Sequence, residues 1–524
     1  MVPHNSKLMV VSRLTLAVAF LSRAALAQPA PAPGPAPARA PAPPVAAPPA
    51  TTATPAAPDG GFTPVADLPE SRTTGELKKR FDALRSGKGL TPDEAARRTV
   101  KNSAAIEAKQ HALENVDAQA SQTMWAFSPK VKLGASYTRL SPVHPDLGNL
   151  PPAATAAFAD FLKIPVNSTS FDANLSVPLS DYVLRYSHAQ AGADRAREAA
   201  VFDRGATYAS VDRDARVYYY GWIRAQAQEI IGAQNLEQAN GHLKDAQNAF
   251  QAGLVSKAEV LSAQVAQKNA ELLLERAKNN TELARLTLEV YMGDAPGQKY
   301  EIGEDVFAPN PALDALPESA AAVREAERQR MEFKSLIAAE KAQRERAALE
   351  RVADYPRLDG IAGATYANPN QRYFPLKQEF HATWQAGVAL TWTPTDIGGA
   401  EAARDASLAR AAELAAQKRM VHDGLRLEVD QALKSAREAR FTIDVAGDAL
   451  AASEESYRVR RELFRAGRAT SVELTDAETE LTRTRLQLAD AHVNARIALV
   501  QLNHALGRDT EPVRAGAQKP PQTP

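Results

Sequence analysis

The fold is decided by FQAGLVSKAEV at Phe250–Val260, a stretch that returns in altered form as FRAGRATSVEL at Phe464–Leu474. The Phe, the Ala-Gly pair and the Glu keep their places in both copies. Gly253 and Gly467 stand where a left-handed residue can end a helix, a conformation that Gly adopts without steric cost. Each copy therefore predicts the end of a helix and a tight turn.

A second helix is predicted to begin directly after each turn. Ser256 is followed three residues later by Glu259, and Thr470 by Glu473. This spacing is the capping box, in which the Ser or Thr caps the first turn of a helix and the Glu caps back. The sequence thus predicts two helical hairpins and an internal duplication.

Proline placement sets the lengths of the hairpin arms, because Pro interrupts helices. The intervals 93–128, 179–295, 318–355 and 395–511 contain no Pro. Each half of the chain is therefore expected to contain one short helix, one very long helix and a return helix about half as long as the long one. Two short helices laid end to end would match one long helix, as in the wall of a tube.

A seven-residue repeat of small side chains follows both turns. Ala recurs with this period from Ala263 to Ala284, and Ala or Thr does so from Ala477 to Ala505. A heptad sustained over this length predicts coiled-coil packing, in which small residues let the partner helix come close.

The segments between the helices alternate apolar and polar residues, the period of a β-strand. FDANLSVPL from Phe171 and WQAGVALTW from Trp384 show this alternation most clearly. Each predicted strand has about the length that a tilted strand needs to cross a bilayer. The four strands are predicted near 129–140, 171–180, 356–368 and 382–393.

Aromatic residues near the predicted strand ends favour a membrane. Trp384, Trp392, Tyr137 and Tyr366 lie where aromatic girdles meet the lipid–water boundary. Four strands cannot close a membrane barrel, which needs at least eight, so an oligomer would have to complete it. The alternative is a periplasmic coiled-coil scaffold without a pore, whose strands pack internally and whose two Trp side chains face protein.

The two ends of the chain differ from the part between them in composition. Residues 1–27 carry basic residues, an apolar run and the small-residue site Ala25-Leu26-Ala27, and predict a signal peptide, with an uncleaved anchor as the alternative. Residues 28–75 are rich in Pro and Ala and predict an extended tether. The remaining divisions are a first repeat at 76–308, a linker at 309–319, a second repeat at 320–510 and a loose tail at 511–524.

Composition disfavours several classes of function. Lys plus Arg and Asp plus Glu both number 62, so no net charge attracts nucleic acid, and no nucleic-acid partner is expected. The absence of Cys excludes disulfides and thiolate zinc sites, and we predict no metal site and no cofactor. The chain has no HExxH, phosphate-loop or nucleophile motif, so we expect no enzyme.

In its order of elements and in its motifs, the chain resembles the TolC-like outer-membrane efflux and secretion channels. The resemblance covers roughly residues 90–507 and rests on LTPDEAARRTVKNSAAIEAKQHALENVDAQ from Leu90, on VPLSDY and WTPTDIGGA after the strands, and on both turn stretches. It implies a mainly α protein that forms a homotrimer. Four strands per chain would build a twelve-stranded transmembrane β-barrel in the outer membrane, and the helices would form an α-barrel in the periplasm.

The same resemblance implies a function and partners. The function would be passive conduction from periplasm to exterior, within a tripartite efflux pump or a type I secretion system. The partners would be a periplasmic adaptor, an inner-membrane pump and outer-membrane lipid. The sequence does not indicate what is transported.

Acidic residues at the second turn ring the periplasmic entrance in such channels. Residue matching gives Glu473 and Asp476 here, with Glu259 at the first turn, and three copies of each carboxylate would favour cations. Capping alone could explain both Glu residues but not Asp476. One departure concerns the Arg that latches the closed state two residues after the turn Gly, because this chain has Ala469 there and Arg468 one position earlier.

Overall fold

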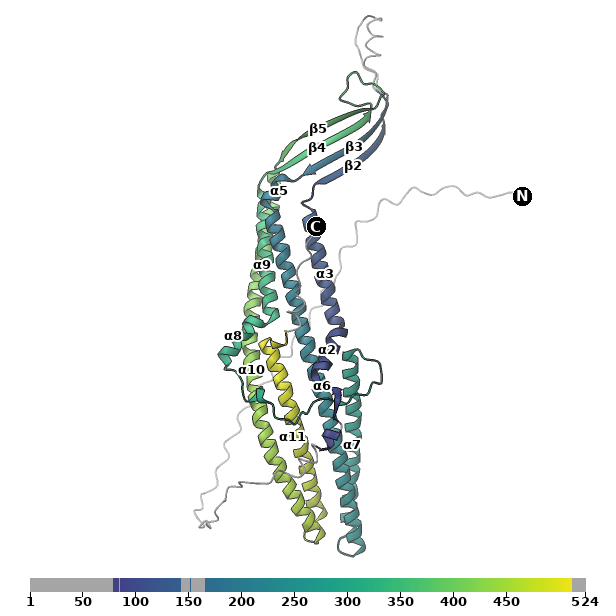
Figure 1. Cartoon of the computed structure of the whole chain (residues 1–524), viewed down its shortest axis with the longest axis vertical. Helices are drawn as coiled ribbons and strands as arrows, with labels where there is room; N and C mark the ends of the chain where they lie inside the picture. The colour runs from purple at the N-terminus through teal and green to yellow at the C-terminus, as the bar shows by residue number, and fades with distance from the viewer. Residues whose placement is uncertain (1–78, 84, 143–150, 152–164, 511–524) are drawn as a thin grey trace, which may run out of the picture. The chain divides into compact units, whose positions relative to one another are not determined.

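The computed structural model describes residues 79–83, 85–142, 151 and 165–510, all within the unit Asp67–Pro524. The predicted signal peptide, tether and C-terminal tail lie outside the described residues. Long helices make up most of the described unit, and a four-stranded antiparallel sheet stands at one end of them (Figure 1). Among the described helices, none combines the length and the hydropathy needed to cross a membrane.

The two halves of the chain contain the same series of helices and strands. The first half comprises β1 (Arg85–Leu90), α2 (Pro92–Asn102), α3 (Ala104–Trp125), β2 (Lys130–Arg139), β3 (Asn167–Val177), α5 (Leu179–Leu184), α6 (Tyr186–Gln251) and α7 (Lys257–Met292). The second comprises α8 (Ser319–Gln329), α9 (Met331–Arg351), β4 (Arg357–Asn368), β5 (His381–Thr391), α10 (Ile397–Arg465) and α11 (Ser471–Leu506). Single 3₁₀ turns lie at Pro311–Leu313, Val352–Asp354, Pro394–Asp396 and Arg508–Thr510. The predicted duplication is confirmed.

Each short helical stretch is broken into two helices, where the sequence predicted one. Ser103 (ψ 115°) and Arg330 (ψ 125°) leave the helical conformation although neither is next to a Pro. The breaks lie where the return helices end. Asn102 Nδ2 donates to the Met292 carbonyl at 2.6 Å, and Arg330 Nη1 donates to the His504 carbonyl at 3.3 Å. The breaks thus supply donors to carbonyls that a helix end leaves unpaired.

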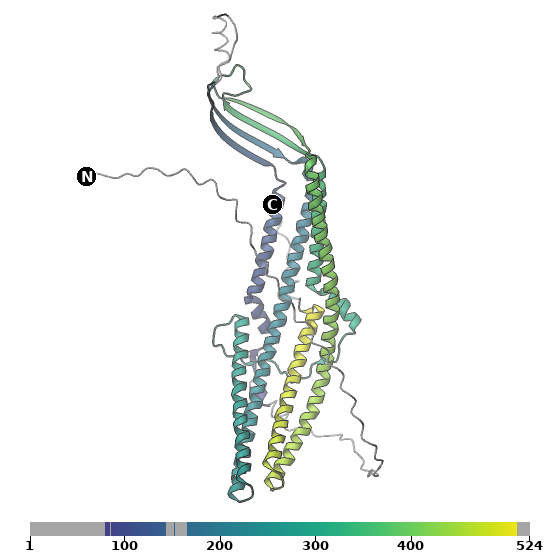
Figure 2. The same cartoon turned by 180° about the vertical axis from the view of Figure 1, so that it is seen from behind.

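The helices lie side by side in a wall (Figures 1 and 2). The long helix α6 packs against α2, α3 and α7 on one side and against α9 and α11 on the other, and α10 packs against α9 and α11. A large buried cluster lies midway along this wall and includes Tyr219, Trp222, Ile223, Ile231 and Leu288. The shorter helices follow one another end to end along the long ones, as their lengths predicted.

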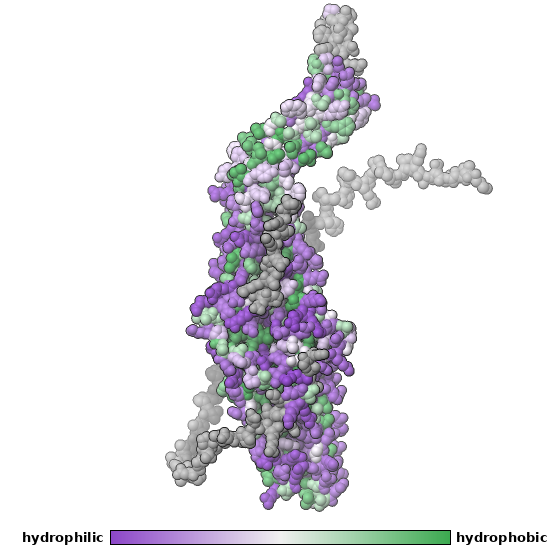
Figure 3. All heavy atoms as spheres, viewed as in Figure 1, coloured by the Kyte–Doolittle hydropathy of each residue, from purple (hydrophilic) through white to green (hydrophobic). Residues whose placement is uncertain are grey.

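The sheet has the strand order β2-β3-β4-β5, and β3 pairs with β4 to join the two halves. In this register Phe171 lies opposite Tyr366, and Ala364 lies opposite Trp384. The predicted alternation is confirmed, so one face of the sheet is apolar and the other is polar. Figure 3 shows hydrophobic residues gathered over the sheet, whereas the helices below it are largely hydrophilic.

The strand that differs most from its predicted bounds is β3. β3 begins at Asn167, before the predicted 171, and it ends at Val177 rather than at 180. Pro178 follows directly and cannot donate a backbone hydrogen bond to a neighbouring strand. Leu179–Leu184 form the short helix α5 instead.

Candidate functional site

The two hairpin tips have the predicted turn geometry. Gly253 and Gly467 have φ angles of 72° and 70°. After the first Gly, the Leu254 N–H donates to the Ala249 carbonyl at 2.9 Å, and after the second, the Arg468 N–H donates to the Leu463 carbonyl at 2.8 Å. This is the pattern that satisfies the last carbonyls of a helix.

The helices that leave the tips are capped differently. At the second tip the capping box is complete, since the Glu473 N–H donates to Thr470 Oγ1 at 3.3 Å and the Thr470 N–H donates to Glu473 Oε2 at 2.9 Å. At the first tip Ser256 Oγ accepts from the Glu259 N–H at 3.4 Å, but the Glu does not cap back. The predicted capping box is therefore wrong in its second half.

Glu259 bonds to the other hairpin instead. Its Oε2 accepts from the Ser471 N–H at 2.7 Å. Ser471 is the first residue of α11, where N–H groups have no partner within the helix and the helix dipole favours a carboxylate. The first tip thus supplies an acceptor to the start of the helix in the second tip.

A buried polar network also joins the two hairpins. His242 of α6 lies between Glu478 and Ser471 of α11, with its Nδ1 3.3 Å from Glu478 Oε2 and its Nε2 3.0 Å from Ser471 Oγ. All three side chains are buried. Sequence reasoning missed this network, although His242 stands in the buried stripe Ala239, His242, Ala246 with helical spacing. A polar residue in such a stripe was the available signal.

Apolar contacts between the hairpins lie next to the network. Ala246, Ala263, Phe464 and Leu474, one from each tip helix, form a buried cluster, and Ala469 packs against it. Ala469 is the residue found where the resemblance implies an Arg that latches the closed state.

A charged contact between the hairpins comes from another Arg. Arg465 Nε lies 3.2 Å from Asp245 Oδ2 and joins α10 to α6. The cross-hairpin Arg therefore precedes the turn Gly, whereas the resemblance led us to look for it after that Gly.

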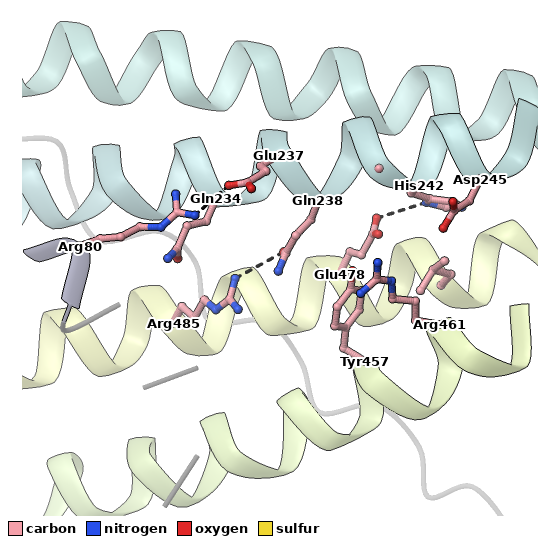
Figure 4. A pocket seen from close by; sticks show the side chains of 12 residues that line it. Arg80, Gln234, Glu237, Gln238, His242, Asp245, Tyr457, Arg461, Glu478 and Arg485 are labelled. Carbon is pink, nitrogen blue, oxygen red and sulfur yellow. Dashed lines mark hydrogen bonds and ion pairs between the residues drawn. The ribbon is translucent and has the colours of Figure 1, made fainter. Parts of the chain in front are cut away.

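A cavity of about 280 Å³ lies beside this network, between α6, α10 and α11. Its lining is highly charged and includes Arg461, Arg485, Asp245 and Glu478, and Arg80 pairs with Glu237 at its edge (Figure 4). The first hairpin contributes the acidic Glu237 and Asp245, and the second contributes Arg461, Arg485 and Glu478. The two hairpins are therefore separated here by a polar cavity, whereas at the tip they pack closely.

Asp476 and Arg468 stand apart from these contacts. Both side chains are exposed, as is that of Glu473. Within the described residues, neither the Asp476 carboxylate nor the Arg468 guanidinium has a hydrogen-bond or ion-pair partner. Asp476 follows Glu473 by one helical turn on α11, so the two carboxylates lie near each other on the exposed side of this helix. Among the described residues, no group of His, Asp or Glu is arranged to hold a metal ion.

The four predicted interface aromatics are all exposed on the sheet or next to it. Trp384 is 77% exposed and Trp392 is 56% exposed, so neither faces protein within this chain, contrary to the expectation for an internally packed scaffold. Tyr137, Tyr366 and Trp384 share the apolar face towards the end of the sheet that lies away from the helices. Trp392 follows β5 at the helical end.

The sequence matches a family described as outer membrane efflux protein over residues 96–294 and 322–508. The chain belongs to this family. The two matched spans correspond to the two halves of the duplication, and each includes one hairpin tip. The predicted family and fold class are confirmed at this level, and the family is one of channels rather than of enzymes.

Solved structures of outer-membrane channels share the fold. CusC is 16% identical, with a TM-score of 0.68 over 79% of this chain and 92% of CusC. CmeC of Campylobacter jejuni is 17% identical, with a TM-score of 0.66 over 82% of this chain and 87% of CmeC. VceC of Vibrio cholerae is 16% identical, with a TM-score of 0.65 over 82% of this chain and 96% of VceC. No curated protein sequence matches the chain.

Proposed function

We propose that three copies of this chain form a channel that conducts solutes passively from the periplasm across the outer membrane. The observation that carries the proposal is the sheet, whose one face is lined by exposed apolar side chains and whose outer strands β2 and β5 have unpaired edges. An unpaired edge cannot remain in lipid, because its N–H and C=O groups would have no partners there. Three copies would pair all edges in a twelve-stranded barrel.

The exposed residues of the helical wall are also consistent with several copies packed in a ring. Its opposite edges are α7 and α10, and both carry exposed apolar side chains along their lengths. On α7 these are Leu261, Val265, Leu272, Leu283, Leu286 and Val290, and on α10 they are Met420, Leu427, Phe441, Val445 and Val459. If α7 of one copy packs against α10 of the next, the same contact repeats from copy to copy. Such a head-to-tail series closes into a ring when the rotation between copies fits, and here the ring would be an α-barrel.

In this arrangement the sheet crosses the outer membrane and the helices extend into the periplasm. The aromatic residues Tyr137, Tyr366 and Trp384 would lie at one lipid boundary and Trp392 at the other. CusC is described as undergoing transmembrane channel formation, and MtrE of Neisseria gonorrhoeae as having an open state. Both descriptions concern proteins with this fold.

The hairpin tips would then form the periplasmic entrance. Three copies of Asp476 and Glu473 would make acidic rings that attract cations. Glu259 would add charge at the same end while holding the two hairpins of one chain together. We further propose that a periplasmic adaptor docks at these tips and links the channel to an inner-membrane pump, as in a tripartite efflux pump or a type I secretion system.

The test is conductance of purified residues 28–524 in a planar lipid bilayer. We expect discrete cation-selective steps that added divalent cations reduce, and a weaker effect of those cations on Asp476→Ala. Glu401→Ala removes an exposed carboxylate near the other end of α10 and serves as the matched control. Protein that does not insert into lipid would contradict the channel and support the periplasmic scaffold.

A further inference from the structure

The connection between β4 and β5, residues 369–380, folds back onto the polar face of the sheet. His381 and Thr383 belong to that face, because they alternate along β5 with residues of the apolar face. Asn370, only 3% exposed, donates from Nδ2 to the His381 carbonyl at 2.9 Å and to Thr383 Oγ1 at 3.2 Å. The Tyr373 ring stacks on the His381 ring with centroids 4.2 Å apart. These contacts hold the connection over the polar face.

The far end of the same connection lies on the opposite face. The Phe380 ring stacks on Tyr366 of the apolar face, with centroids 4.9 Å apart. The connection therefore straddles the end of the sheet. In a barrel, Phe380 would face lipid and residues 370–373 would lie inside the lumen.

Arg372 extends from this connection along the polar face. Its Nη2 donates to Gln385 Oε1 at 3.0 Å and its Nη1 donates to the Trp384 carbonyl at 3.0 Å. Its backbone N–H donates to Asn370 Oδ1 at 3.0 Å, so the buried Asn also orients the Arg. The guanidinium is exposed and so is accessible to solutes that pass along this face.

Arg372 is one of several charged residues on or over the polar face of the sheet. On and over the polar face, basic residues outnumber acidic ones, with Lys130, Lys132, Arg357 and Arg372 against Asp172, Asp359 and Glu379. Two of the acids are already engaged. Asp359 pairs with Arg357 at 3.1 Å, and Asp172 accepts from Thr365 at 2.8 Å. The Arg357–Asp359 pair is neutral and the Thr365 hydrogen bond leaves the charge of Asp172 in place, so the formal charges of these residues still sum to a small positive value.

We propose that Arg372 determines charge selectivity at the outer outlet of the channel, where three copies narrow the lumen and favour anionic solutes. The proposal rests on the proposed channel function and adds a second selecting element to it. The acidic tips would act on solutes at the entrance and the basic outlet on those that leave. A solute that carries a carboxylate or phosphate would be attracted at the outlet.

The first experiment measures the reversal potential of single channels under a KCl gradient. We expect Arg372→Gln to lower the ratio of anion to cation permeability by roughly threefold, and Arg372→Glu to lower it further, because three positive charges are removed from the wall of the lumen. The difference should shrink as the salt concentration rises. Arg139→Gln is the matched control, since it removes an Arg from the same end of the sheet on the apolar-face side.

A second experiment uses the absence of Cys from the chain. A single Arg372→Cys substitution allows charge to be added during recording, with thiol reagents that carry a positive or a negative group. We expect the positive reagent to shift the reversal potential towards anion preference and the negative reagent to shift it towards cation preference, when each is added from the outer side. Pores whose selectivity responds to neither reagent would overturn the role of Arg372 and leave the channel intact. Absence of pores from the unsubstituted chain would instead overturn the channel function on which the proposal rests.

Discussion

The two hairpin tips share one sequence pattern but use their capping glutamates differently. At the second tip, Glu473 bonds back to Thr470 and completes a cap within its own helix. At the first tip, Glu259 accepts instead from Ser471 of the second hairpin. A repeated motif therefore specifies the turn, whereas the neighbouring hairpin decides what the Glu binds.

The second tip is therefore capped within its own helix, and the first tip stabilises the second. Ser471 receives both Glu259 at its N–H and His242 at its hydroxyl, so two groups of the first hairpin hold the start of α11. If the entrance opens by movement of one hairpin against the other, these contacts must break. Substitutions that affect one tip or the contact between the tips can separate these roles.

The largest effect is expected from His242→Ala. It leaves Glu478 buried without its partner, and Glu478 Oε1 already has no hydrogen bond within the described residues. Loss of one member of a buried polar pair costs about 3 kcal/mol. Urea unfolding of the detergent-solubilised protein, followed by helical circular dichroism, measures this loss.

A matched control and a double variant sharpen that measurement. His111→Ala removes an exposed His from α3 and should leave stability nearly unchanged. Adding Glu478→Leu to His242→Ala should recover part of the loss, because the unpaired carboxyl is then gone. Additive losses in the double variant would show that the two residues do not interact.

Replacing the turn glycines tests the similarity of the two tips. Gly253→Ala and Gly467→Ala should each destabilise the protein by about 1 kcal/mol, since both residues have positive φ angles that a Cβ disfavours. Open space surrounds both positions, so the cost is conformational and should be equal. Gly447→Ala, in open space within α10, should instead stabilise by about 0.5–1 kcal/mol. Clearly unequal losses at the tips would contradict a shared turn.

The turns were predictable from the sequence because their signals are local. The hairpins and the alternation of the strands follow from spacings within a short window, and the duplication follows from the return of the same turn stretch in the second half. The breaks at Ser103 and Arg330 were not predictable, because they depend on the ends of α7 and α11 far away in the sequence. The same holds for Glu259, whose partner belongs to the other half.

Removing the capping carboxylates tests the difference between the tips. Glu473→Gln should weaken only the cap of α11, whereas Glu259→Gln should loosen the contact between the hairpins, each by less than about 1 kcal/mol of unfolding free energy. Hydrogen exchange separates the two effects. The first variant should speed exchange at the Thr470 amide and the second at the Ser471 amide. Identical exchange patterns would mean that the two Glu residues are equivalent after all.

The prediction with the smallest expected effect compares the two halves of the chain rather than the two tips. Between α6 and α2, Arg216 Nη1 lies 2.6 Å from Asp93 Oδ1. Between α10 and α8, His422 Nε2 lies 2.8 Å from Glu327 Oε1. Hydrogen bonds to Asp423 and to Glu327 raise the pKa of His422 above its ordinary value, because both carboxylates favour the protonated ring. The folded state therefore binds the His422 proton more tightly than the unfolded state does. The stabilisation that this protonated ring gives to the fold is fully present below the unfolded-state pKa of about 6.5 and is lost as the pH rises through the higher folded-state pKa.

Variants in the two halves should therefore differ in their response to pH. Because His422 is nearly half exposed, His422→Ala should cost only about 0.3 kcal/mol at about pH 5.5 and nothing at about pH 9. Arg216→Ala should cost the same at both pH values, because its guanidinium stays charged throughout this range. Hydrogen exchange of the α8 and α2 amides at the two pH values measures this. A loss at α8 that does not depend on pH would mean that packing of the His422 ring, rather than its charge, holds α8 against α10.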